Sequence, residues 1–496
     1  MPAAPQTSRR AALPGQRGTA PGRQAARGAA RRGRWWPALL VPLAVAVTHL
    51  PSFLRPLWNP DEGFLAVQAR LLAHGGVLYD TVVDRKPPLL PWLYQGLLGL
   101  FGDGSLWPVR VAALVAHTVT ATLLASIARR RWGRRAGLAA GLGYALGSIG
   151  LAPEDTQAAT FEVFMLPWTV AAVAAAERRR WALAGLAVAG AALTKQTGGA
   201  VLLPVAWLLW RGGGKRLPGA LRLAAGFAVP IAAVACALGP GPMLFWTVTG
   251  SGSYASAAGA VATAVGRALG NAGLLLAACA GFAVPVGWLL PRRRRPAGTS
   301  GLWVWLGASA LAVVTGFQFF GHYYLQLLPP LVLLGVAALR ELPRLRRPAA
   351  AWTLLAAAGC LAWGLAAPHA ELDHARRVAA AVRARTGPDD PVLVWGMHPE
   401  DYWLARRTPA SRYLTAGFLT NFSGGHGGAR VGERYAVPGA WDVFRAEVRR
   451  RPPALVVDDS RGAPYAPART PSLRALLASG YHRVATVDGA VVYARG

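Results

Sequence analysis

Residues 59–94 read NPDEGFLAVQARLLAHGGVLYDTVVDRKPPLLPWLY and follow directly on the first long apolar run of the chain. They place Asp61, Glu62, Asp84, Arg85 and Lys86 in a sequence that is otherwise mostly apolar. Ionisable side chains beside a bilayer are costly, so their presence indicates a functional site. A carboxylate can take a proton from a hydroxyl group, and a Lys/Arg pair can hold a phosphate. The stretch therefore predicts group transfer from a lipid-phosphate donor at a membrane face.

The composition and the placement of charge identify the class of protein. The chain has 496 residues, of which 53% are hydrophobic, and its apolar residues fall in runs long enough to cross a bilayer. The net charge of +31 would suit a nucleic-acid partner. However, the arginines cluster between apolar runs, which is typical of cytoplasmic loops. We therefore expect a polytopic α-helical membrane protein with no nucleic-acid partner.

Eleven apolar runs are candidate membrane spans. They cover residues 36–52, 106–127, 136–150, 162–176, 181–194, 199–210, 218–238, 270–290, 302–320, 323–340 and 351–367. With the N-terminus in the cytoplasm, eleven alternating spans place every arginine-rich connection in the cytoplasm. The same alternation places residues 53–105 and the C-terminal region outside. Nearly all basic residues are arginines rather than lysines, which is typical of a GC-rich bacterium, so we expect a bacterial plasma membrane.

Three regions follow from these patterns. Residues 1–34 carry eight arginines and no acids and are expected to form a disordered, basic cytoplasmic tail. Residues 35–367 form the expected transmembrane domain. Residues 368–496 are expected to form a small extracytoplasmic α/β domain. Its expected strands are residues 391–395, 454–458, 483–487 and 490–493, and its expected helices lie near residues 369–386, 441–451 and 470–479.

Two motifs in residues 59–94 each allow two interpretations. Asp61 lies near the start of a short expected helix, where an ionised carboxylate is favoured; it is equally suited to cap that helix. Two prolines after Lys86 hold the backbone extended and would present Arg85 and Lys86 in a stiff geometry. The alternative is a loop whose long charged side chains anchor the next helix at the interface.

Further polar residues lie at the expected outer ends of spans. Lys195 is a lone lysine there, which either phosphate binding or an interfacial role would explain. Glu162 enters the fourth span and should have a basic partner. His322, Tyr323 and Tyr324 could ligate a phosphate or a metal, line a lipid groove, or belong to an interfacial aromatic belt.

The order of these motifs resembles membrane glycosyltransferases of the GT-C class, in particular family 39. That family includes protein O-mannosyltransferases and the bacterial aminoarabinose transferase of lipid A. The resemblance extends over residues 36–340. The matching motifs are Pro60-Asp61-Glu62, Tyr79-Asp80, Lys86-Pro87-Pro88-Leu89 with Trp92, Phe161-Glu162, Lys195-Gln196, and His322-Tyr323-Tyr324-Leu325 with Pro329-Pro330.

The resemblance implies transfer of a sugar from a polyprenyl-phosphate donor to an extracytoplasmic acceptor, which could be a glycan, a lipid or a protein of the cell envelope. It implies that Asp61, with Glu62 beside it, is the catalytic base. In-line attack by an acceptor hydroxyl, with the base on one side and the leaving group on the other, would invert the anomeric centre. The donor phosphate would be held by Lys86, Arg85, Lys195 and Arg267. The implied donor and acceptor pocket contains Tyr79, Asp84, Glu162, His322, Tyr323 and Tyr324.

Cofactor use is a separate question. Some relatives have a glutamate before the lysine of the Lys-Pro motif, where it can join a metal site, whereas this chain has Arg85 there. A divalent metal would have to be held by Asp84, Glu162 or His322, so no cofactor is firmly expected. His398, Glu400 and Asp401 also resemble metal ligands, but their adjacency favours ordinary surface polarity.

Two other functions also fit the sequence. One is a lipid-linked sugar transporter or flippase, and the other is a non-catalytic protein that binds a lipid-linked sugar. Transporters often show repeated halves and charges near the middle of the membrane. This sequence shows neither feature, which favours the transferase.

Overall fold

The structure is a computed structural model that describes the chain except for residues 2–35, 214–215, 252–260, 291–295 and 423–429. The expected basic tail therefore lies almost wholly outside the described residues. Residues Val41–Gly496 form one compact unit. The other unit, Met1–Leu40, contributes to the described residues only Met1 and the first turns of helix α2.

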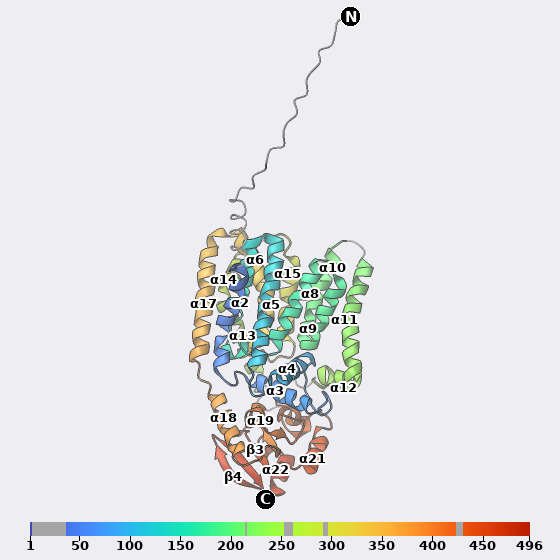
Figure 1. Cartoon of the computed structure of the whole chain (residues 1–496), viewed down its shortest axis with the longest axis vertical. Helices are drawn as coiled ribbons and strands as arrows, with labels where there is room; N and C mark the ends of the chain where they lie inside the picture. Colours follow the sequence, from blue (N-terminus) through green and yellow to red (C-terminus); the bar gives the residue numbers. More distant parts are fainter. Residues whose placement is uncertain (2–35, 214–215, 252–260, 291–295, 423–429) are drawn as a thin grey trace. The chain divides into compact units, whose positions relative to one another are not determined.

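Every apolar run of the sequence contains a helix. These helices are α2 (Trp36–Thr48), α5 (Trp107–Trp132), α6 (Arg134–Gly147), α8 (Phe161–Glu177), α9 (Trp181–Thr194), α10 (Leu202–Arg211), α11 (Arg216–Leu238), α13 (Val261–Ala278), α14 (Ala280–Leu289), α15 (Ser300–Val314), α16 (Leu328–Glu341) and α17 (Arg346–Ala366) (Figure 1). The run at residues 270–290 is divided, because α13 ends at Ala278 and α14 begins at Ala280. Among the described helices, five are long and apolar enough to cross a membrane.

Short elements connect the long helices. The α-helical ones are α3 (Pro60–Ala73), α4 (Leu89–Phe101), α7 (Pro153–Thr156) and α12 (Pro240–Thr247). The 3-10 helices among them are η1 (Leu50–Leu54), η2 (Gln196–Val201), η3 (Thr249–Ser251), η4 (Gly321–Leu327) and η5 (Pro343–Leu345). Two more, η6 (Glu433–Tyr435) and η7 (Pro467–Arg469), lie in the C-terminal region.

Helix α3 begins where its sequence says it should. The Asn59 side chain accepts a hydrogen bond from the backbone N–H of Asp61 at 2.9 Å, as a helix cap does. Pro60 occupies the first helical position, where its missing N–H costs nothing. Asp61 and Glu62 then fall in the first turn, which places both carboxylates at the positive end of the helix.

The C-terminal residues form a sheet with helices around it. The helices are α18 (Ala370–Arg383), α19 (Glu400–Ala405), α20 (Gly417–Thr420), α21 (Ala440–Arg450) and α22 (Pro471–Ala478). The strands are β1 (Pro391–Trp395), β2 (Thr408–Pro409), β3 (Leu455–Asp458), β4 (Tyr481–Val487) and β5 (Ala490–Arg495), in the order β2-β1-β3-β5-β4.

Strand β1 pairs in parallel with β2 and β3, while β5 pairs antiparallel with β3 and β4. The β4–β5 hairpin turns at Asp488 and Gly489, which both have positive φ, as a tight two-residue turn requires. The four strands expected from the sequence are all present, and the short β2 is the one that the sequence pattern missed.

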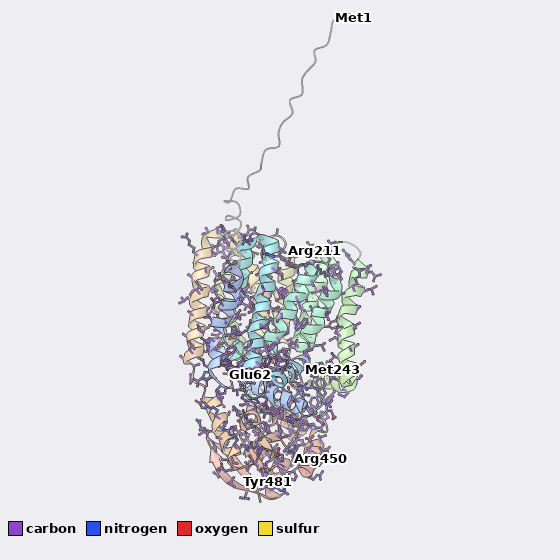
Figure 2. All side chains as sticks on the ribbon, in the orientation of Figure 1. Met1, Glu62, Arg211, Met243, Arg450 and Tyr481 are labelled. Atoms are coloured by element: carbon purple, nitrogen blue, oxygen red, sulfur yellow. The ribbon has the colours of Figure 1, made fainter. Side chains whose placement is uncertain are left out.

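The C-terminal sheet region packs on the helices rather than standing apart as a separate compact unit. Helix α19 lies against α3 so closely that a Cβ on Gly63 would sit 2.6 Å from the Cβ of Glu400. Arg412 donates to the carbonyl of Asp80 at 2.6 Å, and Trp58 packs on His369 with ring centroids 4.9 Å apart. Figure 2 shows Glu62 at this junction and Arg211 at the opposite end of the helices.

We expect Gly63→Ala to destabilise the protein by about 1–3 kcal/mol, because the added methyl group must displace backbone as well as side-chain atoms of Glu400. The measurement is the thermal unfolding midpoint in detergent. Gly96→Ala is the matched control: it lies in neighbouring α4 with no atom near its added Cβ. Helix propensity should make this control neutral or slightly stabilising. Equal midpoints for both variants would contradict close α3–α19 packing.

Candidate functional site

A cavity of about 500 Å³ lies where α3, the loop before α4, α8, η2, η4 and the C-terminal sheet region meet. It is lined by Asn59, Pro60, Asp61, Phe64, Asp84, Arg85, Lys86, Glu154, Phe161, Glu162, Lys195, Phe320, His322, Tyr323, Met397, Pro399, Thr415, Gly417, Phe418 and Phe422. Segments that are hundreds of residues apart in the chain therefore contribute to one site.

Most of the candidate residues from the sequence line this cavity. They are Asp61, Asp84, Arg85, Lys86, Glu162, Lys195, His322 and Tyr323. Four candidates do not line it, namely Glu62, Tyr79, Arg267 and Tyr324.

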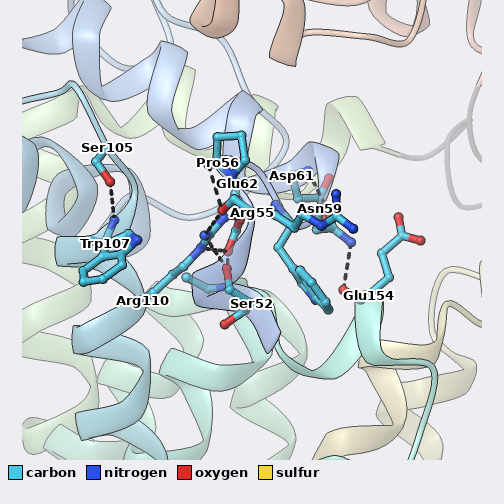
Figure 3. A network of polar contacts seen from close by, with 12 residues as sticks. Ser52, Arg55, Pro56, Asn59, Asp61, Glu62, Ser105, Trp107, Arg110 and Glu154 are labelled. Atoms are coloured by element: carbon cyan, nitrogen blue, oxygen red, sulfur yellow. Dashed lines mark hydrogen bonds and ion pairs between the residues drawn. The ribbon is translucent and has the colours of Figure 1, made fainter. Parts of the chain in front are cut away.

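Asp61 presents an exposed carboxylate to the cavity from the first turn of α3. Within the described part of the chain, no basic side chain forms an ion pair with it. The neighbouring Asn59 side chain donates to the backbone carbonyl of Glu154 at 3.2 Å, and the Glu154 side chain also lines the cavity (Figure 3). The carboxylate of Asp61 is thus held in position by its helix and remains accessible to a hydroxyl group or a cation.

Glu62 points away from the cavity and is fully buried. It accepts from Arg110 Nη2 at 2.7 Å and from the backbone N–H groups of Trp58 and Ala159 at 3.1 and 2.9 Å. Arg110 in turn donates to the carbonyls of Ser52, Arg55 and Pro56 (Figure 3). Glu62 therefore holds the start of α3 in place and, unlike the catalytic position expected for it, does not line the cavity.

The loop that carries Arg85 and Lys86 is held through its backbone. Tyr79 Oη donates to the Lys86 carbonyl at 2.9 Å, and Gln196 Nε2 donates to the Arg85 carbonyl at 2.6 Å. Tyr79 itself has φ 69° and, unlike the pocket position expected for it, is not among the residues that line the cavity. The Arg85 guanidinium lies 4.8 Å from the Phe418 ring centroid. The two cations are thus presented on a stiff backbone, as the prolines predict.

Asp84 is buried beside this loop. It accepts a hydrogen bond from Gln68 Nε2 at 3.0 Å. Burial raises the pKa of its carboxyl, and the Gln68 hydrogen bond and the Lys86 charge only partly oppose this. Asp84 thus favours its neutral form more than an exposed aspartate does.

Lys195 and Glu162 form a buried ion pair at the wall of the cavity. This confirms that the carboxylate at the start of α8 has a basic partner. The Lys195 ammonium also lies 3.6 Å from the ring centroid of Tyr323, a cation–π contact. Burial lowers the pKa of Lys195 to about 8, although Glu162 favours its charged form.

His322 belongs to a separate pair. Its Nδ1 lies 2.9 Å from Asp155 Oδ1, and its ring stacks on Phe320. Burial lowers the pKa of His322, but the charges of Glu162 and Asp155 outweigh it and raise the pKa overall. Tyr324 donates to the carbonyl of Ala268 at 2.8 Å and is directed away from the cavity.

The Arg267 guanidinium lies 4.9 Å from the ring centroid of Phe320, which lines the cavity. Neither Arg267, expected to hold the donor phosphate, nor Tyr324, expected in the donor and acceptor pocket, is among the residues that line this cavity.

The three metal candidates are spread over different contacts. Asp84 lies with Gln68, Glu162 with Lys195, and His322 with Asp155. In the described part of the chain, no three His, Cys, Asp or Glu side chains converge in a way that could hold a metal ion. The three candidates thus lie in separate contacts, and the reaction proposed below has no step through a metal.

Sequence reasoning missed the wall that the C-terminal region supplies. It is formed by Met397, Pro399, Thr415, Gly417, Phe418 and Phe422, which follow α16 by more than fifty residues and show no motif. The adjacent Glu400 and Asp401 are each 1% exposed, so their interpretation as surface polarity is wrong. They belong to a buried cluster in which His374 and His398 contact Asp459 at 2.9 and 3.8 Å.

Comparisons with known proteins agree with this architecture. Residues 85–238 match the family model described as dolichyl-phosphate-mannose-protein mannosyltransferase, which is less than half of the chain. No curated protein sequence matches the chain.

Solved structures with a similar fold include ArnT from Cupriavidus metallidurans in the apo state. It is 19% identical with a TM-score of 0.63, and the match covers 93% of this chain and 98% of ArnT. ArnT bound to undecaprenyl phosphate is 18% identical with a TM-score of 0.59 over 92% and 98% of the two chains.

The oligosaccharyltransferase AglB from Archaeoglobus fulgidus, in complex with an inhibitory peptide and a dolichol-phosphate, is 13% identical with a TM-score of 0.53. The match covers 94% of this chain and 74% of AglB. At these identities the structural matches show the shared fold. Together with the family match, they show that this membrane protein has the fold of the GT-C glycosyltransferases and resembles their dolichyl-phosphate-mannose-dependent family, as its motifs indicate.

Proposed function

We propose that this protein transfers a sugar from a polyprenyl-phosphate donor to a hydroxyl group of an extracytoplasmic acceptor. One observation carries the proposal: a single cavity joins the accessible carboxylate of Asp61 to the cations Arg85, Lys86 and Lys195. The binding of undecaprenyl phosphate by ArnT and of dolichol-phosphate by AglB supports a lipid-phosphate donor.

The eleven-span topology belongs to this proposal. In it the cavity and the C-terminal sheet region face the outside, and the arginine-rich connections face the cytoplasm. Lys86 enters the cavity from the loop before α4, so the donor phosphate would lie at the outer face of the membrane. The long apolar carrier would then remain in the bilayer while its sugar reaches the cavity.

The proposed reaction is an in-line displacement. The acceptor oxygen attacks the anomeric carbon, the bond from that carbon to the phosphate oxygen breaks, and Asp61 takes the hydroxyl proton. Lys86 and Arg85 stabilise the negative charge that develops on the leaving phosphate. Attack opposite the leaving group inverts the anomeric centre. Glu162 keeps Lys195 at the cavity wall as a further cation for the phosphate.

The test uses the purified full-length protein, a polyprenyl phosphate carrying a radiolabelled sugar, and a membrane-plus-wall extract as acceptor. We expect transfer by the wild type and a ten- to hundredfold rise, roughly, in the donor KM for Lys86→Ala, because a charged hydrogen bond to phosphate is lost. Arg70→Ala is the control, since Arg70 pairs with Asp103 at 2.7 Å outside the cavity.

Other outcomes would favour the competing functions. Labelled lipid that binds but is never consumed, with any acceptor extract, indicates a non-catalytic binding protein. Labelled lipid that crosses liposomes without loss of its sugar indicates a transporter. Transfer with an unchanged donor KM in Lys86→Ala would remove Lys86 from the phosphate site.

The depressed pKa of Lys195 predicts an alkaline limit to activity. Its ammonium is present below a pKa of about 8 and is lost above it. We therefore expect kcat/KM to fall above a pH of about 8, by at most the ten- to hundredfold, roughly, that loss of one phosphate contact costs. In Lys195→Arg the charge persists, so the fall should move to higher pH. The same alkaline limb in both proteins would show that Lys195 does not cause it.

A further inference from the structure

A second cavity, of about 520 Å³, lies at the other end of the helices from the candidate site. Helix α5 runs from one site to the other. Arg110 in its first turn supports α3 beside the candidate site, and Trp132 at its last position lines the second cavity. A helix of 26 residues is about 39 Å long. The second cavity therefore belongs to a different site, at the end that carries the arginine-rich connections.

This second cavity is an open groove whose walls are mostly apolar. Phe282 of α14 lines the groove and packs tightly between two glycines. A Cβ added to Gly143 would lie 2.4 Å from the Phe282 ring, and a Cβ added to Gly335 would lie 2.5 Å from the Phe282 Cβ. Ala139 on α6 and Ala350 on α17 line the groove and are exposed, as is Leu354. Small residues on facing helices thus leave an open apolar channel.

Three arginines lie along the same groove. Arg135 is in the first turn of α6, Arg340 is in the last turn of α16, and Arg346 begins α17. Arg346 donates to the carbonyls of Leu339 and Arg340 at 2.9 and 3.3 Å, which holds the turn between α16 and α17. Among the described residues, no carboxylate pairs with any of the three, and the lining contains no acidic side chain.

We propose that this groove binds an anionic phospholipid, with acyl chains against the apolar wall and the phosphate at Arg135, Arg340 and Arg346. Basic pockets between transmembrane helices suit anionic head groups, and guanidinium groups hold phosphate oxygens in pairs. A zwitterionic head group carries a cation that the three arginines would repel. A second copy of the chain related by twofold symmetry would place like charges against each other. Charge complementarity therefore favours the anionic lipid.

The test counts lipids bound to the purified full-length protein by native mass spectrometry. The probes are dioleoylphosphatidylglycerol and dioleoylphosphatidylcholine, each titrated into delipidated protein. We expect the wild type to retain the anionic lipid at least about tenfold more tightly. The variant Arg135→Gln/Arg340→Gln/Arg346→Gln should lose that preference. Ala139→Trp/Ala350→Trp should fill the apolar channel and weaken binding of the anionic lipid without changing charge.

The control is Arg134→Gln/Arg344→Gln/Arg347→Gln, which removes the same charge from the same two connections at arginines that do not line the groove. It should bind both lipids as the wild type does. An equal loss in this control would show general surface attraction and overturn the proposal. Equal binding of the two lipids by the wild type would also overturn it. So would a groove variant that loses a protein dimer of the wild type but keeps its lipid binding. Thermal unfolding midpoints confirm that each variant is folded.

Discussion

Asp61→Asn is expected to abolish sugar transfer while the donor lipid still binds. An asparagine keeps the size of the side chain but cannot accept the hydroxyl proton, so the transfer rate should fall about 10²-fold or more. The start of α3 should be unaffected, because Asn59 bonds the backbone of Asp61 and not its carboxylate. The measurement is single-turnover transfer of label together with donor binding.

Glu154→Gln provides the matched control, since its carboxylate lines the same cavity from α7. It should retain most of the activity if Asp61 is the base. A larger loss in Glu154→Gln than in Asp61→Asn would move the role of base to Glu154. Full activity in both variants would show that neither carboxylate takes the proton.

Arg110→Met is expected to destabilise the protein by about 3–5 kcal/mol, because it leaves the carboxylate of Glu62 buried without its cation. Both side chains are at most 1% exposed, so water cannot replace the lost partner. The backbone carbonyls of Ser52, Arg55 and Pro56 would also lose the hydrogen-bond donor that Arg110 supplies. The unfolding midpoint in detergent measures the effect.

The double variant Arg110→Met/Glu62→Leu separates a buried charge from simple misfolding. It should recover part of the lost stability, because replacing both partners of a buried pair with apolar side chains is often tolerated. Independent residues would instead have additive effects, so that Glu62→Leu lowers the stability of Arg110→Met by as much as it lowers that of the wild type. That outcome would contradict the ion pair seen in the structure.

The sequence alone indicated much of the fold and most of the site. Runs of apolar residues and the arginine clusters between them predict the helices, because the bilayer demands length and hydrophobicity in each span. The Asp-Arg-Lys-Pro-Pro motif was also visible in the sequence, and its three charged residues line the cavity in the structure. The strands of the C-terminal region were equally readable, since short runs of β-forming residues between helical stretches are a local feature of the sequence.

Which side of α3 each carboxylate faces was decided only by the tertiary structure. Asp61 and Glu62 are adjacent in sequence, yet one faces the cavity and the other pairs with Arg110, which is distant in the chain. The partners of Lys195 and the wall formed by Met397, Pro399 and Phe418 also depend on long-range packing. Sequence patterns report periodicity within one element, whereas a site assembled from several elements depends on how those elements pack.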